Sequence, residues 1–227
     1  MRTSRTIILT GTAIGLTFAA FSPGARANLL VDPGFEVNAL TTYTNVLNNF
    51  VGYQGIWGVE SATISGVDGG VTPAQGARML RMTDDGLVAT QAFQATDVTS
   101  YAALIDSGGA TVNLSALLNA GPNVPAGVGG VTVRFFTAAN WGSAIGAPVS
   151  GSLALDNLSG TWQTASVSTA IPVSTRWLIT EVAFTNSTML GNPGYVDAAD
   201  LTVTPEPASL GLLCLGGLLL IRRRSVA

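Results

Sequence analysis

Carboxylates are the main reactive side chains that this sequence offers. The 227 residues include thirteen Asp and Glu, ten Arg and one Cys, but no His and no Lys. Without His there is no Ser-His-Asp triad, Cys-His dyad or imidazole metal site. One Cys forms neither an internal disulfide nor a thiolate zinc cluster. The chemistry that remains is that of carboxylates, which bind cations or act in pairs in glycoside hydrolysis.

No pair of acids is singled out for hydrolysis, because none stands at a distinctive spacing in the sequence. The consecutive Asp84 and Asp85 precede Gly86, which is typical of a hairpin turn and not of the spaced ligands of an EF-hand. A nucleophile-elbow motif, a dinucleotide-binding glycine motif and a P-loop are absent. We therefore expect a protein that is not an enzyme, and keep a carboxylate-pair glycosidase as an alternative.

Aromatic residues in turn-like segments are candidates for sugar binding. An aromatic ring stacks on the apolar C–H face of a pyranose, while amides and carboxylates hold the hydroxyl groups. Tyr53 and Trp57 lie in a segment rich in Gly and Asn, and Trp141 lies in an Asn-Trp-Gly turn. Two interpretations stay open, because these rings either form a ligand platform or pack into the core. Trp162 and Trp177 lie in strand-like stretches and are expected in the core.

The first residues have the features of a secretory signal peptide. Arg2 and Arg5 form a positive region, an apolar stretch follows, and Ala25 and Ala27 are the small residues that precede a cleavage site. We expect the signal peptide to be residues 1–27, with cleavage after Ala27 and export across the inner membrane. An uncleaved N-terminal anchor is the alternative.

Residues 204–227 have the features of a second targeting segment. An apolar stretch is followed directly by three Arg, and such charges after an apolar helix act as a stop-transfer signal that stays in the cytoplasm. The stretch is short for a hydrocarbon core of ~30 Å, so a buried core helix ending in Arg is the alternative. The motif is Pro205, Glu206 and Pro207, the transmembrane helix covers about 208–221, and the cluster is Arg222, Arg223 and Arg224.

These residues resemble a PEP-CTERM sorting signal, which combines this motif, a short apolar helix and a terminal Arg cluster. The resemblance implies a Gram-negative-type bacterium whose exosortase, an inner-membrane transpeptidase-like protease, recognises and processes the tail. It also implies an association with exopolysaccharide. We therefore expect transient anchoring in the inner membrane, followed by transfer to the cell surface or the extracellular space.

Residues 28–203 form the segment between the two targeting signals. They include four Arg and twelve acidic residues, a net charge of −8. A domain this acidic repels phosphate, so we expect no nucleic-acid partner. The segment is long enough for one domain with a core of its own.

Short runs of alternating apolar residues, separated by Gly, Pro, Asn and Asp, predict strands along this segment. Many short strands with turn signals between them predict an all-β fold, an antiparallel β-sandwich or barrel. A helix is expected only within residues 101–118, which a Gly pair splits. The predicted strands cover residues 59–64, 87–95, 131–137, 162–168, 178–184 and 196–203.

Several short sequences in this segment resemble those of carbohydrate-binding modules with a jelly-roll, galactose-binding-like architecture. Each is short, but together they sample most of the segment. The resemblance implies an antiparallel β-sandwich of the jelly-roll type. The sequences are residues 28–36, 72–80, 161–163, 194–197 and 201–203.

The same resemblance implies a structural calcium ion between the first and last strands. By position, Glu36 and Asp197 match the carboxylates that family members use there, and the carbonyl groups of residues 76–78 are further candidate ligands. The alternative is that both carboxylates are solvated or paired with Arg78 or Arg81.

These features together predict an exported surface or extracellular-matrix protein. Its β-sandwich is expected to have a structural or adhesive role near exopolysaccharide. The alternative is a carbohydrate-binding module with a defined glycan site that includes Tyr53, Trp57 and Trp141.

Overall fold

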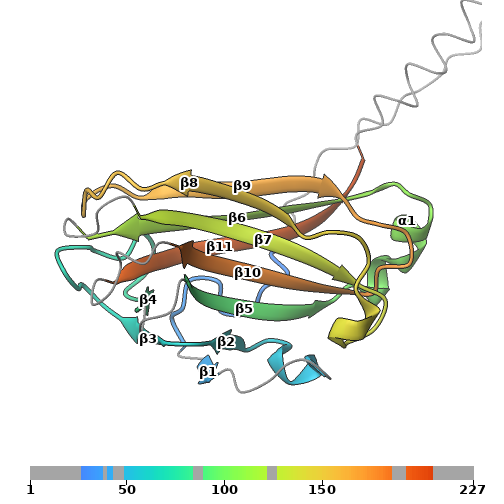
Figure 1. Cartoon of the computed structure of the whole chain (residues 1–227), viewed down its shortest axis with the longest axis horizontal. Helices are drawn as coiled ribbons and strands as arrows, with labels where there is room; N and C mark the ends of the chain where they lie inside the picture. The colour runs from blue at the N-terminus through green and yellow to red at the C-terminus, as the bar shows by residue number, and fades with distance from the viewer. Residues whose placement is uncertain are drawn as a thin grey trace, which may run out of the picture.

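The computed structural model describes residues 27–37, 40–42, 49–83, 89–121, 127–185 and 193–206. Two sheets pack face to face in an antiparallel β-sandwich of the jelly-roll type (Figure 1). The predicted all-β fold class is therefore confirmed. The expected signal helix and the expected helix at 208–221 lie outside the described residues. Over the ranges given above, no helix is long and apolar enough to cross a membrane.

The six-stranded sheet has the strand order β1-β2-β5-β10-β7-β8. Its first two strands run parallel, and the remaining neighbours pair antiparallel. Its strands are β1 (Leu40–Thr42), β2 (Trp57–Val59), β5 (Ala89–Asp97), β7 (Val128–Phe136), β8 (Val149–Ala154) and β10 (Trp177–Thr185).

The five-stranded sheet has the order β3-β4-β11-β6-β9, with antiparallel pairing between neighbours. The predicted strand at 59–64 is in fact divided between β2 and β3, which belong to different sheets. The predicted hairpin turn at 84–86 lies outside the described residues, and the strands that flank it, β4 and β5, also belong to different sheets. The strands are β3 (Ala62–Ser65), β4 (Met79–Met82), β6 (Ala110–Ala120), β9 (Gln163–Ala170) and β11 (Gly194–Pro205).

The prediction of a helix within residues 101–118 is wrong for most of that range. A 3₁₀ turn, η2 (Thr99–Tyr101), leads into the short helix α1 (Ala102–Asp106), and the following residues form the strand β6. Buried and partly exposed residues alternate along β6. This period of two fits a strand with one face in the core, and it outweighs the helical composition of the segment.

The core lies between the two sheets and consists of the inward-facing residues of both. Removal of these apolar side chains from water is the main force that holds the sheets together. The six-stranded sheet contributes Ala92, Val131, Val133, Phe135, Leu178, Val182 and Phe184, and the five-stranded sheet contributes Leu80, Val112, Leu114, Leu118, Val196 and Leu201.

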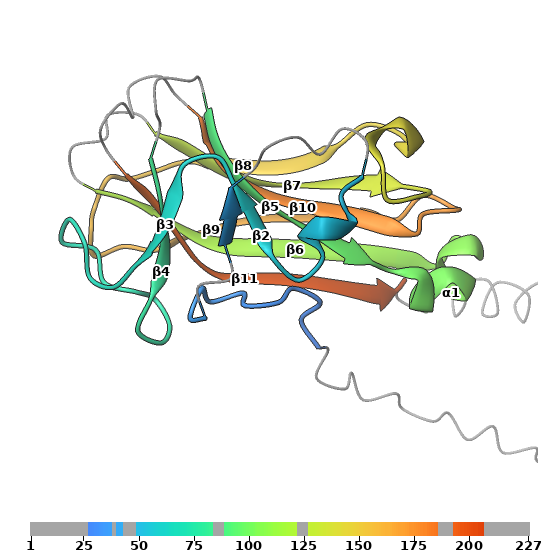
Figure 2. The ribbon, with the colours of Figure 1, turned by 90° about the horizontal axis from the view of Figure 1, so that it is seen from below.

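Residues 28–37 run beside β11, as Figure 2 shows in blue below that strand. The backbone N–H of Leu29 donates to the carbonyl oxygen of Leu201 (2.9 Å). The Asn28 side chain donates to the carbonyl oxygen of Ala199 (2.7 Å) and accepts from the N–H of Leu201 (3.0 Å). These bonds attach the start of the domain to its last strand.

The same segment is bonded to the six-stranded sheet. The side-chain amide of Gln94, on β5, accepts from the N–H of Val31 (2.8 Å) and donates to its carbonyl oxygen (3.0 Å). The indole N–H of Trp57, on β2, also reaches the carbonyl oxygen of Val31 (3.2 Å). Gln94 is buried, so these bonds are shielded from water and the N-terminal segment connects the two sheets.

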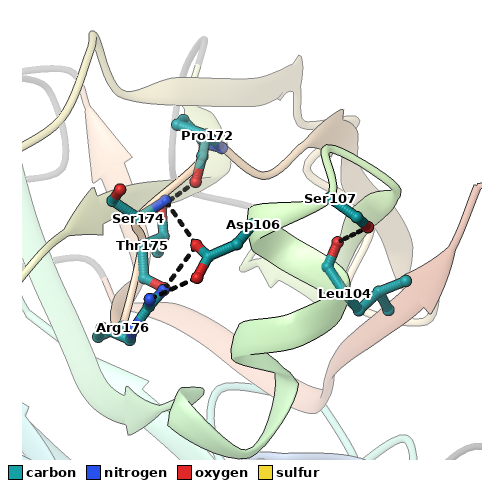
Figure 3. A network of polar contacts seen from close by, with 7 residues as sticks. All are labelled: Leu104, Asp106, Ser107, Pro172, Ser174, Thr175 and Arg176. Carbon is teal, nitrogen blue, oxygen red and sulfur yellow. Dashed lines mark hydrogen bonds and ion pairs between the residues drawn. The ribbon is translucent and has the colours of Figure 1, made fainter.

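The helix α1 is fixed to the turn between β9 and β10 by one acid (Figure 3). Asp106 accepts from both terminal nitrogens of Arg176 (3.1 and 2.7 Å) and from the backbone N–H of Ser174 (3.1 Å). The bonds from Arg176 and Ser174 lower the pKa of Asp106. This pair is exposed, so we regard it as positioning the turn and not as a large source of stability.

The edge strands β8 and β9 approach each other closely at Gly151. A Cβ atom at this position would collide with the backbone carbonyl oxygen of Ser166. The residue must therefore be glycine for the two sheets to meet at this edge.

Replacement of Gly151 by alanine should push β8 away from β9 and lower the free energy of unfolding. The expected loss is about 1–3 kcal/mol, the usual cost of an added methyl group in a filled space. Thermal unfolding of the purified protein should show a melting temperature lower by several degrees. Gly160→Ala is the matched control, because the space around Gly160 is open. Equal melting temperatures for the two variants would contradict this account of the edge.

Candidate functional site

Two carboxylates from opposite ends of the domain, Glu36 and Asp197, meet at the loop of residues 74–78. Asp197 is fully buried at a bulge in β11. One of its oxygens accepts the backbone N–H of Gln75 (2.9 Å), and the other accepts the N–H of the next residue in the chain (2.7 Å). Glu36 accepts the N–H groups of Ala77 (2.9 Å) and of the residue after it (3.1 Å). The 74–78 loop thus connects the start and the end of the domain.

The pKa of Asp197 is raised, and burial is the main cause. The backbone N–H groups of Gln75, Ala198 and Ala74 act in the opposite direction, while the negative charge of Glu36 raises the pKa further. Ionisation of Asp197 is therefore less favourable here than in water, and a cation beside it would offset both burial and repulsion.

Calcium binds carboxylate and carbonyl oxygens, and Glu36 and Asp197 supply two carboxylates at this loop. In the described ranges, no three His, Cys, Asp or Glu residues are grouped closely enough to hold a metal. Ligands other than Glu36 and Asp197 would therefore be carbonyl oxygens or water. The expected alternative of a pairing with Arg81 is wrong, because Arg81 bonds to Asp68 (2.7 Å). Arg78 contacts Glu36 through its backbone N–H.

The outer face of the six-stranded sheet, the face turned away from the core, brings polar and aromatic side chains together. Strand register places Phe93, Glu181, Thr132 and Ser150 in one row across β5, β10, β7 and β8. Arg134 lies in the next row, opposite Ile179. Figure 1 shows these four strands side by side.

The polar groups of this face already form hydrogen bonds with one another. Arg134 donates to Glu181 Oε2 from Nε (3.2 Å) and Nη2 (3.1 Å). The hydroxyl groups of Thr132 and Ser150 are 2.8 Å apart. Such bonds hold the side chains in fixed positions, which favours recognition of a ligand with many hydroxyl groups.

The aromatic groups lie beside this polar area. Tyr53, in the turn η1 (Val51–Tyr53), stacks on Phe93 with ring centroids 4.8 Å apart. Its ring occupies the space above Gly58, where a Cβ would lie only 2.6 Å from the Tyr53 ring. Trp141, in η3 (Trp141–Ser143), contacts Phe136 edge to face at 5.2 Å, and Arg134 lies 5.5 Å from the centre of its ring.

The three predicted glycan-binding residues have different surroundings. Tyr53 and Trp141 are partly exposed on the outer face, next to the polar row. Trp57 is fully buried between the sheets, and its ring packs against Phe35. Its predicted role in a glycan platform is therefore wrong, because side chains alternate along β2 and that of Trp57 points inward.

The polar residues of the outer face carry no motif that would mark them as a site in the sequence. Thr132, Arg134 and Glu181 lie in strands that were predicted correctly, at positions that alternate with core residues. The alternation marks them as outward-facing. Their meeting in adjacent rows depends on strand pairing, which a single sequence does not reveal.

The expected sorting motif begins inside the last strand. β11 continues to Pro205, which pairs with Ala110, and the N–H of Glu206 donates to the carbonyl oxygen of Gly109 (2.8 Å). The last strand thus extends two residues beyond the expected domain boundary at residue 203. Outside the described residues lie Ala25, Pro207, Arg222, Arg223 and Arg224. Ala27 is described and exposed, and it directly precedes the bonded Asn28.

Comparison with known proteins identified no matching family model and no matching curated protein. The solved structures with a similar fold include three carbohydrate-binding modules. A family 61 carbohydrate-binding module, in complex with β-1,4-galactotriose, is 15% identical over 79% of this chain and 99% of that one, with a TM-score of 0.47. A family 16 module is 14% identical over 77% and 99%, with a TM-score of 0.47. A family 22 module of the Clostridium thermocellum xylanase Xyn10B is 16% identical over 69% and 91%, with a TM-score of 0.46.

Identities of 14–16% and TM-scores below 0.5 do not establish what this chain binds. The ligand has to be inferred from the side chains of the chain itself.

We propose that Glu36 and Asp197 hold a structural calcium ion, and expect calcium to raise the melting temperature. Binding to the folded state alone stabilises it by about 2.7 kcal/mol when calcium is at one hundred times Kd. The rise in melting temperature caused by calcium should be larger at pH 7 than at pH 4, because calcium needs ionised carboxylates. Without calcium, in EDTA, the pH dependence of stability should have the opposite sign. Because the pKa of Asp197 is raised by folding, this group contributes stability at pH values below its ordinary pKa of 3.8, and this contribution is lost as the pH rises through the pKa of the folded state.

Thermal unfolding in calcium and in EDTA, at both pH values, measures these effects. Asp197→Asn should remove the calcium increment, whereas Asp156→Asn, a change of an exposed acid in another loop, should keep it. Melting curves that do not differ between calcium and EDTA would exclude the site.

Proposed function

We propose that this protein is a non-catalytic, carbohydrate-binding β-sandwich, and that the outer face of the six-stranded sheet is its glycan site. The observation that carries the proposal is the position of two partly exposed rings, Tyr53 and Trp141, beside a row of side chains that form hydrogen bonds. Flat rings next to fixed polar groups match a sugar, which has an apolar C–H face and a rim of hydroxyl groups.

The residues of the outer face divide into two roles in this proposal. The rings of Tyr53 and Trp141 stack on sugar units, and the contacts behind them keep both rings in place. Thr132, Ser150 and Glu181 bind hydroxyl groups. A sugar hydroxyl group can donate a hydrogen bond to the Glu181 carboxylate. It can also donate to, or accept from, the hydroxyl group of Thr132 or Ser150.

The geometry supports binding in preference to catalysis. Glu181 forms an ion pair with Arg134 and is therefore held as an acceptor. A glycosidase needs a second carboxyl group that protonates the leaving oxygen. Two further described acids lie near this face: Glu60 accepts a hydrogen bond from the side chain of Gln91 (2.9 Å), and Asp97, at the end of β5, accepts one from the backbone N–H of Thr99 (2.8 Å). Each of these acids therefore already has a hydrogen-bonding partner.

We further propose that the protein is exported and sorted to the cell surface or the extracellular space, where its ligand is exopolysaccharide. The support is the sequence of residues 1–27 and 205–224. An exosortase-type protease and the inner membrane are the partners that this delivery requires.

Removal of either exposed ring should weaken polysaccharide binding. We expect Tyr53→Ala and Trp141→Ala each to lower affinity by about tenfold, the effect of a loss of roughly 1.4 kcal/mol at a contact in the centre of a site. Affinity electrophoresis against a panel of plant and bacterial polysaccharides, followed by calorimetry with the best ligand, measures this.

Trp162→Ala is the matched control for the exposed rings. Trp162 is also a partly exposed Trp, but it packs beside Tyr195 and Met79 on the five-stranded sheet. Its loss should leave affinity unchanged once the melting temperature shows that the variant is folded. If Trp162→Ala is the only one of these variants to lose binding, the site is on the other sheet.

Replacement of Glu206 by alanine should leave an unprocessed precursor in the inner membrane, because the resemblance makes this carboxylate part of the sorting motif. Cell fractionation and the intact mass of the protein report processing. Asp156→Ala, on the sandwich, should be processed normally. A Glu206→Ala protein with the wild-type mass and surface display would contradict the sorting hypothesis.

A further inference from the structure

We infer that the glycan bound by the outer face is a neutral one, and that the site discriminates against glycans that carry carboxylate or sulfate groups. This inference rests on the proposed function and specifies its ligand class. It follows from the charges of the domain and from the pairing of its few cations.

Cations are scarce on the sandwich, and most of them are neutralised. Residues 28–203 contain four Arg, no Lys and no His, against twelve acids. Arg81 pairs with Asp68 at 2.7 Å, and Arg176 pairs with Asp106 at 2.7 Å. The potential around such a domain is negative, so an anionic polymer is repelled before it makes contact.

The outer face has one Arg among its described residues, and this Arg is not free. Arg134 donates two hydrogen bonds to Glu181 and also lies against the ring of Trp141. An anionic ligand could use Arg134 only by displacing Glu181. The Glu181 side chain is 14% exposed, so the displaced carboxylate would stay partly buried without its partner, which is costly.

A neutral sugar avoids this cost because it can bind without breaking the ion pair. Both bonds from Arg134 go to Glu181 Oε2, so Oε1 can accept from a sugar hydroxyl group. The hydroxyl pair of Thr132 and Ser150 both donates and accepts. The ion pair then serves to orient Glu181 toward hydroxyl groups and to exclude a second negative charge.

The test compares one polysaccharide in two forms. The first is a neutral polysaccharide that the purified full chain binds, and the second is the same polymer with its primary hydroxyl groups oxidised stepwise to carboxylates. We expect affinity to fall with each step, by about tenfold overall at low salt, because like charges are brought together. Added salt should recover part of the loss, since it screens the repulsion.

Two variants separate the role of the ion pair from the net charge of the domain. Glu181→Gln frees Arg134 and removes one negative charge from the face, so it should shift the preference toward the oxidised polymer. Asp200→Asn, on β11 of the opposite sheet, removes the same charge elsewhere and should leave the preference close to that of the wild type.

The outcomes distinguish this inference from the proposed function. If the oxidised polymer binds as tightly as the neutral one or more tightly, or if the Glu181→Gln variant keeps the wild-type preference, the inference is overturned while carbohydrate binding stands. If neither form of any polysaccharide binds, the proposed function fails as well.

Discussion

The hydrogen bonds that residues 28–37 make to both sheets are the interactions on which the other features depend. With one Cys in the sequence, an internal disulfide cannot close the domain. Gln94 holds the segment on one sheet, and the backbone of Leu201 holds it on the other. These bonds fix the direction in which the chain continues to Glu36. The carboxylate at the end of the segment therefore reaches the 74–78 loop, where Asp197 is already buried.

One alternation of side chains builds both the core and the candidate glycan site. In β7, Val133 faces the core while Arg134 faces outward, and the same change of face separates Val182 from Glu181 in β10. A slip of one residue in either strand would bury a charge and expose an apolar side chain. The burial of the core thus fixes the register that places Arg134 beside Glu181.

The sequence predicted the fold class and most of the long strands, because hydrophobic alternation is a local signal. It failed at β6, where Ala and Leu suggested a helix, and at Trp57, where the richness of the segment in Gly and Asn suggested a loop. Both failures have the same cause, since composition was given more weight than the burial that tertiary contacts impose. The pairing of Arg134 with Glu181 is a property of strand order, which no local pattern contains. The meeting of Glu36 with Asp197 was inferred from a resemblance and not from spacing.

The path of β11 also determines how the domain responds to mechanical force. This strand pairs with β6 from Gly194 to Pro205, and the chain leaves the sheet at its end. A pull on the chain beyond Glu206 therefore acts along the strand. Antiparallel backbone hydrogen bonds lie perpendicular to that direction, so the load is shared by many bonds in shear and does not open them one at a time. In the proposed function, in which the outer face binds a polysaccharide, a domain attached through this strand would resist extraction by flow.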